Sequence, residues 1–240
     1  MSIINKEFIK KYITNNGDEG EVPFRWSHGS TDYHIGDGIL IYSLIYYLRL
    51  KTCVCLGSGG GFIPRIMTQA RLDLVKDGTF TYDKGITIVV DDMSERWGET
   101  DWESKDSFFR KNFRPTVIME TSEDAYFSYF IKHGIKIDYL HIDANHNYPF
   151  VKKDFELYSK ILSKNGIITM HDTDIDYANN IWGKDNYEKE YFNFTGGPTK
   201  VVKEITKGGE FEVLNLSNSD IVKRDKNSTG ITILKRKKNK

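Results

Sequence analysis

The chain has 240 residues, of which 39% are hydrophobic and 13% aromatic, so it can bury a substantial core as one large domain. Lysine plus arginine and aspartate plus glutamate each total 34, giving zero net charge, which argues against nucleic acid or an anionic membrane as partner. No apolar run is as long as a membrane span, and the N-terminus lacks the apolar core of a signal peptide.

The two cysteines, Cys53 and Cys55, lie two positions apart on a predicted strand. Neighbours at this spacing along a strand do not form an ordinary disulfide, and two thiolates are too few for a zinc site. We therefore interpret both as small apolar residues, which is typical of a reducing compartment, and expect a cytoplasmic protein.

Residues 1–36 are predicted to form a helix over 5–14 and a polar segment that covers an active site or merely connects. From residue 37 onward, strand and helix patterns alternate. The predicted helices cover 39–48, 63–74, about twenty residues after Asp92, 122–131, 150–162 and the stretch from 197. The predicted strands are 53–56, 86–90, 115–119, 137–142, 167–170, 211–216 and 230–234. This alternation predicts an α/β fold, doubly wound, with a mostly parallel seven-stranded sheet.

Ligands bind at the carboxyl ends of the strands in such a sheet. The first five predicted strands all end in residues suited to binding or catalysis, namely Gly57–Gly61, Asp91-Asp92, Glu120–Ser122, Asp143–His146 and His171-Asp172. This coincidence favours a functional site along that edge over a set of unrelated turns.

The glycine loop has four glycines in five positions, which lets a ligand lie against the backbone, or simply makes a tight turn. A dinucleotide-binding loop, G-x-G-x-x-G, would need a glycine at Phe62. The shorter Gly57-x-Gly59-x-Gly61 pattern favours an adenosyl cofactor without phosphates. The predicted contacts from this loop are Gly57, Ser58, Gly59 and Gly61.

Asp91 follows the second strand directly, where a carboxylate can accept hydrogen bonds from both ribose hydroxyls. Asp92 could serve instead, and either acid could only cap the next element. Thr121 and Ser122 are candidates for the adenine edge, although Ser122 could equally be a helix cap.

Three stretches then identify a family: Tyr139–Tyr148 (YLHIDANHNY), Val151–Phe155 (VKKDF) and Gly166–Thr173 (GIITMHDT). The chain resembles the class I S-adenosylmethionine-dependent methyltransferases, and within them the sugar and small-molecule O-methyltransferases whose fourth strand reads I-D-x-x-H-x-Y. The resemblance covers roughly residues 36–235 and implies a Rossmann-like methyltransferase domain over 37–240.

The resemblance implies that Asp143 and Asp172 bind a divalent cation, Mg2+ being expected, together with His171 at a position that often ligates in the family. His171 and Asp172 could instead simply cap the turn after the fifth strand. The resemblance also implies that His146 is the general base that removes the acceptor's hydroxyl proton, beside Asp143, the alternative being a surface histidine. The family usually has an acid where this chain has Cys55, and Asp37 is a candidate replacement.

His141 lies within the fourth strand and is interpreted as a packed core residue, and Tyr148 as a packing residue. The aromatic segment 174–196 is either a lid over the acceptor or part of an oligomer interface.

The sequence thus predicts an O-methyltransferase that uses S-adenosylmethionine and Mg2+ to modify a hydroxyl of a sugar, nucleotide-activated sugar or glycan-like small molecule. The alternatives are a nicotinamide-dependent oxidoreductase on the same fold and a non-catalytic cofactor-binding relative. A homo-oligomer is compatible with the sequence.

Overall fold

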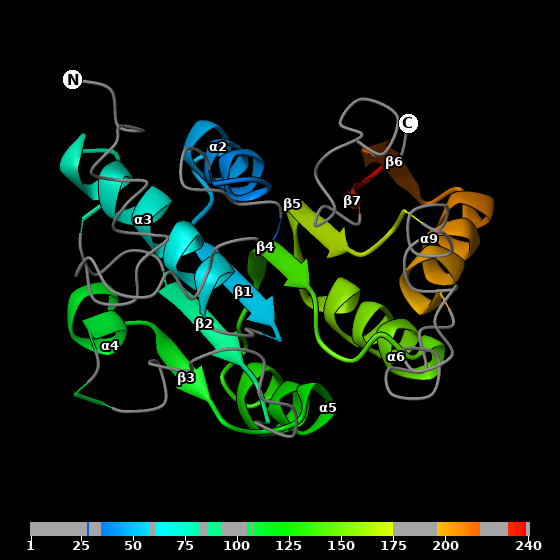
Figure 1. Cartoon of the computed structure of the whole chain (residues 1–240), viewed down its shortest axis with the longest axis horizontal. Helices are drawn as coiled ribbons and strands as arrows, with labels where there is room; N and C mark the ends of the chain where they lie inside the picture. The colour runs from blue at the N-terminus through cyan, green and yellow to red at the C-terminus, as the bar shows by residue number, and fades with distance from the viewer. Residues whose placement is uncertain are drawn as a thin grey trace.

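The computed structural model describes residues 28, 35–57, 61–81, 86–92, 105–106, 108–174, 196–216 and 230–238. These ranges contain one seven-stranded sheet with the order β3-β2-β1-β4-β5-β7-β6. Strands β1 to β5 pair in parallel, and β7 runs antiparallel to both β5 and β6. The predicted mostly parallel, doubly wound sheet is therefore confirmed (Figure 1).

The strands are β1 Thr52–Leu56, β2 Ile86–Val90, β3 Thr116–Ile118, β4 Ile137–Ile142, β5 Leu162–His171, β6 Phe211–Leu216 and β7 Ile231–Arg236. The helices are α2 Gly38–Leu48, α3 Phe62–Lys76, α4 Phe108–Phe113, α5 Ser122–Ala125, α6 Tyr148–Tyr158 and α9 Gly197–Gly208. A π-helix, η2 Tyr126–Ile131, continues α5, and a 3-10 turn, η3 Ser159–Ile161, follows α6. The predicted helix 5–14 and nearly all of the predicted lid lie outside the described residues. No helix within the described ranges is long and apolar enough to cross a membrane.

Helices cover both faces of the sheet. The α2–α3 side holds one hydrophobic cluster and the α5–α6–α9 side the other, as the positions of these helices in Figure 1 show. Alternation along β1 sends Cys53 and Cys55 to the first cluster and Val54 and Leu56 to the second. Both thiols are free and buried, as predicted, and burial raises the pKa of Cys53 to about 12, so this thiol stays protonated in the core.

The chain reverses its direction of winding between β1 and β4, and this switch point positions the site. Leu56 pairs with Val90 on one side and Ile142 on the other, so the residues that follow these strands emerge together. The N–H of Gly57 donates to the carbonyl of Val90, and the N–H of Asp143 donates to that of Leu56, both at 2.9 Å. The glycine loop and the Asp143 turn are thereby neighbours.

Strand β5 begins at Leu162 rather than at the predicted Ile167, and the helix before it ends at Tyr158. Ile137 of β4 pairs with Leu162, but Tyr139 pairs with Ile167, so β5 contains a large bulge. Gly166 lies in this bulge, where an added Cβ would come within 2.9 Å of the Ile137 carbonyl oxygen. The Asn-Gly pair therefore marks a strand bulge and not the end of a helix.

The helix after β3 is capped by Thr121 and not by the predicted Ser122. The side-chain oxygen of Thr121 accepts a hydrogen bond of 3.1 Å from the N–H of Asp124. The hydroxyl of Ser122 donates to the carboxylate of Asp154 on α6 instead, and Tyr158 donates to the Ser122 carbonyl at 2.7 Å. These contacts join α5 to α6.

Asp154 is a buried acid with 3% of its surface exposed. Burial raises its pKa to about 6, and the hydrogen bond from Ser122 only partly counteracts this effect. Because the folded-state pKa lies above the usual aspartate value of about 3.9, protonated Asp154 favours the folded state at low pH. That contribution is lost as the pH rises from about 4 through about 6.

We therefore expect Asp154→Asn to stabilise the protein at pH 8 by up to about 3 kcal/mol, because the amide still accepts from Ser122 without carrying a buried charge. Near pH 4 the gain should disappear. Urea unfolding at pH 8 and at pH 4 measures the free energy of unfolding of the variant and of the wild type. Glu156→Gln, at an exposed position of the same helix, is the control and should change stability by less than about 0.5 kcal/mol at either pH. An equal gain in stability at both pH values would contradict the raised pKa assigned to Asp154.

Candidate active site

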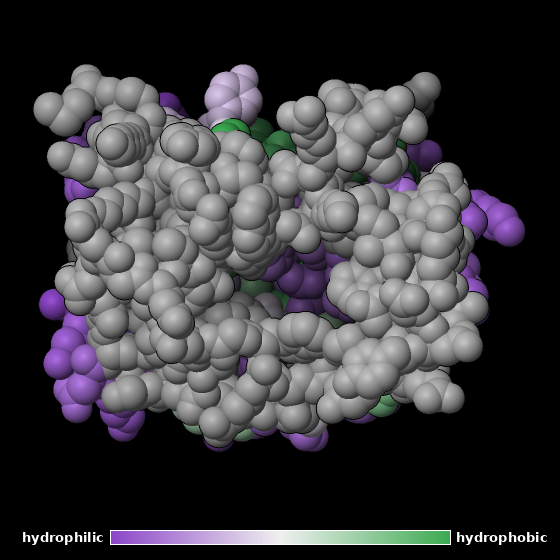
Figure 2. Space-filling model, in the orientation of Figure 1, coloured by the Kyte–Doolittle hydropathy of each residue, from purple (hydrophilic) through white to green (hydrophobic). Residues whose placement is uncertain are grey.

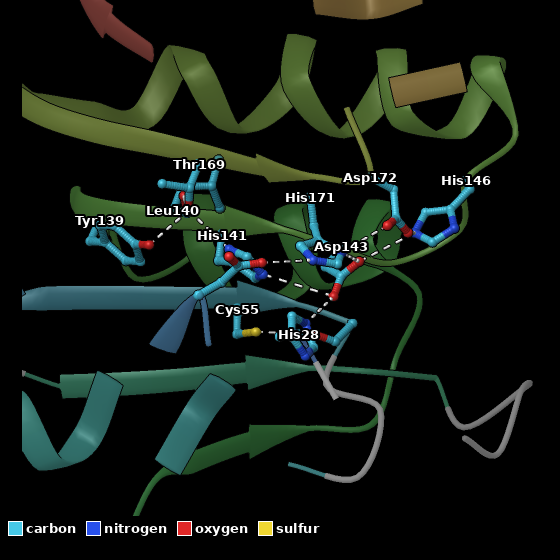
Figure 3. Close-up of polar contacts among 12 residues, drawn as sticks. His28, Cys55, Tyr139, Leu140, His141, Asp143, His146, Thr169, His171 and Asp172 are labelled. Atoms are coloured by element: carbon cyan, nitrogen blue, oxygen red, sulfur yellow. Dashed lines mark hydrogen bonds and ion pairs between the residues drawn. The ribbon is translucent and has the colours of Figure 1, made fainter. Parts of the chain in front are cut away.

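Acidic and histidine side chains gather at the carboxyl ends of β4 and β5 (Figure 3). Asp143 and His146 follow β4, and β5 ends in His171, which Asp172 follows. In Figure 2, hydrophilic residues are visible at the place where β4 and β5 end in Figure 1. The sheet edge thus presents a polar site.

Asp143 lies at the centre of this cluster. Its Oδ1 is 3.2 Å from Nε2 of His146 and 3.5 Å from Nδ1 of His171. Its Oδ2 is 2.9 Å from Nε2 of His28 and 3.8 Å from Nε2 of His141. Burial by itself raises the pKa of Asp143, but His171 and the neighbouring imidazoles outweigh it and hold that pKa well below its usual value. Asp143 is therefore an ionised carboxylate with imidazoles on both sides.

Asp172 is the second carboxylate, and its backbone is in the left-handed region with φ of 55°. Such a conformation is uncommon for residues other than glycine and often marks a functional position. Oδ2 of Asp172 is 3.2 Å from Nε2 of His146, and Oδ1 is 3.1 Å from Nδ1 of His171. The turn after β5 thus aims this carboxylate at the same imidazoles that contact Asp143.

The two carboxylates control the protonation of His146 and His171. Burial lowers the pKa of both imidazoles, but Asp172 and Asp143 outweigh burial and raise them, that of His171 well above its usual value. Asp143, Asp172 and His146 each place one donor atom within 4.8 Å of the others, a spacing that could hold a metal ion. The predicted site residues Asp143, His146, His171 and Asp172 are therefore brought together.

Asp37 joins the cluster from the residue before α2. Its Oδ2 is 3.3 Å from Nε2 of His171, and within the described ranges neither atom has a hydrogen-bond partner. The thiol of Cys55, where the family has an acid, donates to the carbonyl of Gly57 at 3.0 Å, and burial raises its pKa well above the usual value. Cys55 is thus a neutral residue beneath the site, and Asp37 is an acid beside His171.

Two histidines of the site were missed from the sequence. His141 is buried, as predicted for a core residue, but its Nε2 faces Asp143. The sequence did contain an indication of this contact. Residues two apart on a strand share a face, and Asp143 follows His141 at that spacing. His28 reaches Asp143 from 115 positions away in the sequence, and no local pattern indicates that contact.

Two of the predicted cofactor residues, Gly57 and Asp91, lie near this cluster. The N–H of Asp91 donates to the carbonyl of Ile118 at 3.1 Å, which fixes this acid at the end of β2 next to Gly57. Gly61, with φ of 89°, precedes α3. The first turn of α3 contains no acid, and among the described residues no side chain caps it. Asp91 is half-buried and Asp92 exposed, whereas Ser58 and Gly59 lie outside the described residues.

Gly57 has a φ of 74°, and an added Cβ would lie 2.1 Å from the carbonyl oxygen of Asp143. The absence of a side chain at this position is therefore required by the turn after β4, irrespective of any ligand. This contact also fixes the start of the glycine loop against the residue at the centre of the acid and histidine cluster.

A family model described as "Methyltransferase domain" matches residues 54–173, which span β1 through the end of β5 and include the whole cluster from Asp143 to Asp172. The chain belongs to this family. The prediction of an S-adenosylmethionine-dependent methyltransferase is confirmed at this level, and the nicotinamide-dependent oxidoreductase is not supported. Among proteins of curated function, none matches this methyltransferase.

Several solved structures share the fold of this methyltransferase. An O-methyltransferase from Bacillus cereus in complex with SAH has 13% identity and a TM-score of 0.59, covering 84% of this chain and 80% of that one. The O-methyltransferase TomG from Streptomyces achromogenes, in complex with SAM, has 13% identity and a TM-score of 0.60 and covers 92% of each chain. A putative caffeoyl-CoA O-methyltransferase from Staphylococcus aureus has 13% identity and a TM-score of 0.56, covering 83% and 82%.

The contact between Gly57 and the Asp143 turn predicts a specific loss of stability in Gly57→Ala. The Cβ must displace backbone atoms, so we expect a loss of more than about 4 kcal/mol. Gly78→Ala is the matched control, because φ is 79° there and nothing lies within 4 Å of its Cβ. It should cost only about 1–2 kcal/mol of backbone strain. Chemical unfolding measures both, and equal losses would contradict the proposed contact.

Proposed function

We propose that this protein is an S-adenosylmethionine-dependent O-methyltransferase that acts on a hydroxyl of a sugar, nucleotide-activated sugar or glycan-like small molecule. A divalent cation, with Mg2+ the expected ion, assists the reaction. The observation that carries the proposal is the pair of carboxylates with adjoining imidazoles, Asp143, Asp172, His146 and His171, at the switch point of a methyltransferase-family sheet.

The residues beside β1 and β2 suit the cofactor. Asp91 offers a carboxylate to a ribose, next to Gly57. The start of α3, which no side chain of the described residues caps, offers backbone N–H groups to the cofactor's carboxylate. When bound, S-adenosylmethionine supplies a methyl group on a sulfonium sulfur, which a hydroxyl oxygen can accept in one displacement. Two of the fold relatives named above were solved with SAM or SAH.

The acid cluster suits a cation. Two largely buried carboxylates and an imidazole are a donor set for a hard or borderline divalent ion, and His171 or His146 would supply the nitrogen. A bound cation supplies positive charge that lowers the pKa of an acceptor hydroxyl. His146, partly exposed and beside both carboxylates, would take the proton of that hydroxyl at Nε2.

The acceptor class rests on two supports. The turn after β4 reads I-D-x-x-H-x-Y, the motif through which the sequence resembles sugar and small-molecule O-methyltransferases. The second is that the solved structures with the same fold include the O-methyltransferase TomG, involved in tomaymycin synthesis, and a putative caffeoyl-CoA O-methyltransferase. A transfer assay over nucleotide sugars, free glycosides and catechols tests the class, and methylation of catechols alone would overturn the sugar assignment.

Asp91→Ala should weaken S-adenosylmethionine binding by about 10- to 100-fold, because charge-assisted hydrogen bonds to the ribose are lost. Isothermal titration calorimetry measures the affinity. Asp92→Ala is the matched control, since that neighbour is exposed, and should bind normally. If the two results are reversed, the ribose contact belongs to Asp92.

His146→Ala should lower kcat by about 100- to 10,000-fold while Mg2+ affinity is retained, as expected for a general base. His171→Ala should instead weaken Mg2+ binding. Mg2+ titration calorimetry together with kcat separates these roles. Lost Mg2+ affinity in His146→Ala would make it a ligand and not the base, and full activity in EDTA would exclude the cation.

A further inference from the structure

We propose a second cation site, formed by His28, His141 and the Oδ2 side of Asp143, that takes a borderline divalent ion such as Zn2+ or Co2+. This site is distinct from the Mg2+ site at Asp172. Its donor atoms, two imidazole nitrogens and one carboxylate oxygen, all lie within 4.8 Å of one another. The inference concerns metal binding alone and does not depend on the proposed methyl transfer.

The spacing of the three donors suits such an ion. Bonds of about 2.0–2.2 Å in tetrahedral geometry place ligand atoms roughly 3.3 Å apart. Oδ2 of Asp143 is 2.9 Å from Nε2 of His28 and 3.8 Å from Nε2 of His141, values on either side of that spacing. Three protein ligands leave a fourth position open, as in catalytic zinc sites.

His141 supplies the independent observation that points to a ligand. This imidazole is fully buried, and within the described part of the chain its Nε2 has no hydrogen-bond partner. At 3.8 Å, the nearest carboxylate oxygen lies beyond hydrogen-bonding distance. A buried polar atom without a partner is costly, so its orientation toward Asp143 calls for an electrophile between them.

The other nitrogen of His141 fixes which atom carries the hydrogen. Nδ1 is 2.9 Å from Oγ1 of Thr169, which also lies 2.7 Å from the hydroxyl of Tyr139. The Leu140 carbonyl, 3.5 Å from Oγ1 of Thr169, can accept the single hydroxyl hydrogen, which leaves the oxygen able to accept from both neighbours. We assign the tautomer in which Thr169 accepts from Nδ1–H. Nε2 then presents a lone pair toward the carboxylate, as a metal-ligating histidine does when its other nitrogen donates to a second group.

The Asp143 carboxylate separates the two sites. Oδ1 faces His146 and His171 on the Asp172 side, whereas Oδ2 faces His28 and His141 (Figure 3). An ion pair between His28 and Asp143 accounts for one of these contacts but leaves the lone pair of His141 opposed to a carboxylate. Nitrogen donors favour borderline ions, while the carboxylate-rich side suits Mg2+, so donor type distinguishes the two positions.

Co2+ titration in excess Mg2+, without acceptor or cofactor, tests the second site. The wild-type protein should bind one Co2+ with the intense visible absorption of a four-coordinate ion. His28→Ala and His141→Gln should each weaken binding by more than the roughly 10- to 100-fold typical of lost outer-shell contacts. Asp172→Asn should keep both the affinity and the spectrum, because that carboxylate lies on the other side.

His133→Ala is the matched control, since this histidine is exposed in the turn after η2, and it should titrate like wild type. Circular dichroism checks folding. If His141→Gln does not fold, His28→Ala decides, because His28 lies outside the sheet.

Absence of Co2+ binding, or wild-type binding in the His28 variant, would overturn the proposal. Loss of binding only in Asp172→Asn would assign the ion to the Mg2+ site, and none of these outcomes depends on whether methyl transfer occurs.

Discussion

The site depends on one partly buried carboxylate, that of Asp143, with imidazoles beside both of its oxygens. Asp143 contacts histidines that come from the segment before α2, from β4, from the turn after β4 and from β5. An ionised carboxylate in a sheltered position is costly unless positive charge or hydrogen-bond donors surround it. Compensation of this single negative charge therefore brings side chains from four separate parts of the chain to one place.

The backbone around Asp143 imposes a second constraint. Its N–H is bound by Leu56 of β1, and its carbonyl oxygen lies against Gly57, where a side chain would not fit. The start of the glycine loop and the acid cluster consequently cannot move independently. For a methyltransferase this matters because positioning the acceptor oxygen relative to the methyl group accounts for much of the catalysis.

The two faces of the sheet serve different purposes near this edge. On the α5–α6 side, apolar residues dominate the core, and the buried Asp154 is held by a hydroxyl hydrogen bond. On the other side, Cys55, His141 and His171 bring polar atoms progressively closer to the carboxyl edge. The polar network thus begins with the buried hydrogen bond between Tyr139 and Thr169 and ends at Asp143, at the carboxyl edge of the sheet. A cation bound at that opening would be supported by residues that are themselves immobilised by packing.

The sequence by itself determined the order of strands and helices in the described ranges, although not the π-helix η2, the 3-10 turn η3 or the early start of β5. Alternation of apolar strands with amphipathic helices specifies a doubly wound sheet, and parallel pairing places the residues after each strand at one edge. Asp143, His146, His171 and Asp172 could therefore be assigned to one site before any contact was known. The bulge at Gly166 and the cap at Thr121 were not predicted, because both depend on partners across the sheet or on backbone geometry that local patterns do not encode.

Only the tertiary structure decided which atoms face one another. The contact of His28 with Asp143 joins residues 115 positions apart, and no periodicity carries that information. The role of His141 also required the fold, since burial is equally consistent with a packed ring and with a directed nitrogen. Hydrogen bonding to Thr169 on the neighbouring strand makes that distinction, because a bond at one ring nitrogen fixes where the other points.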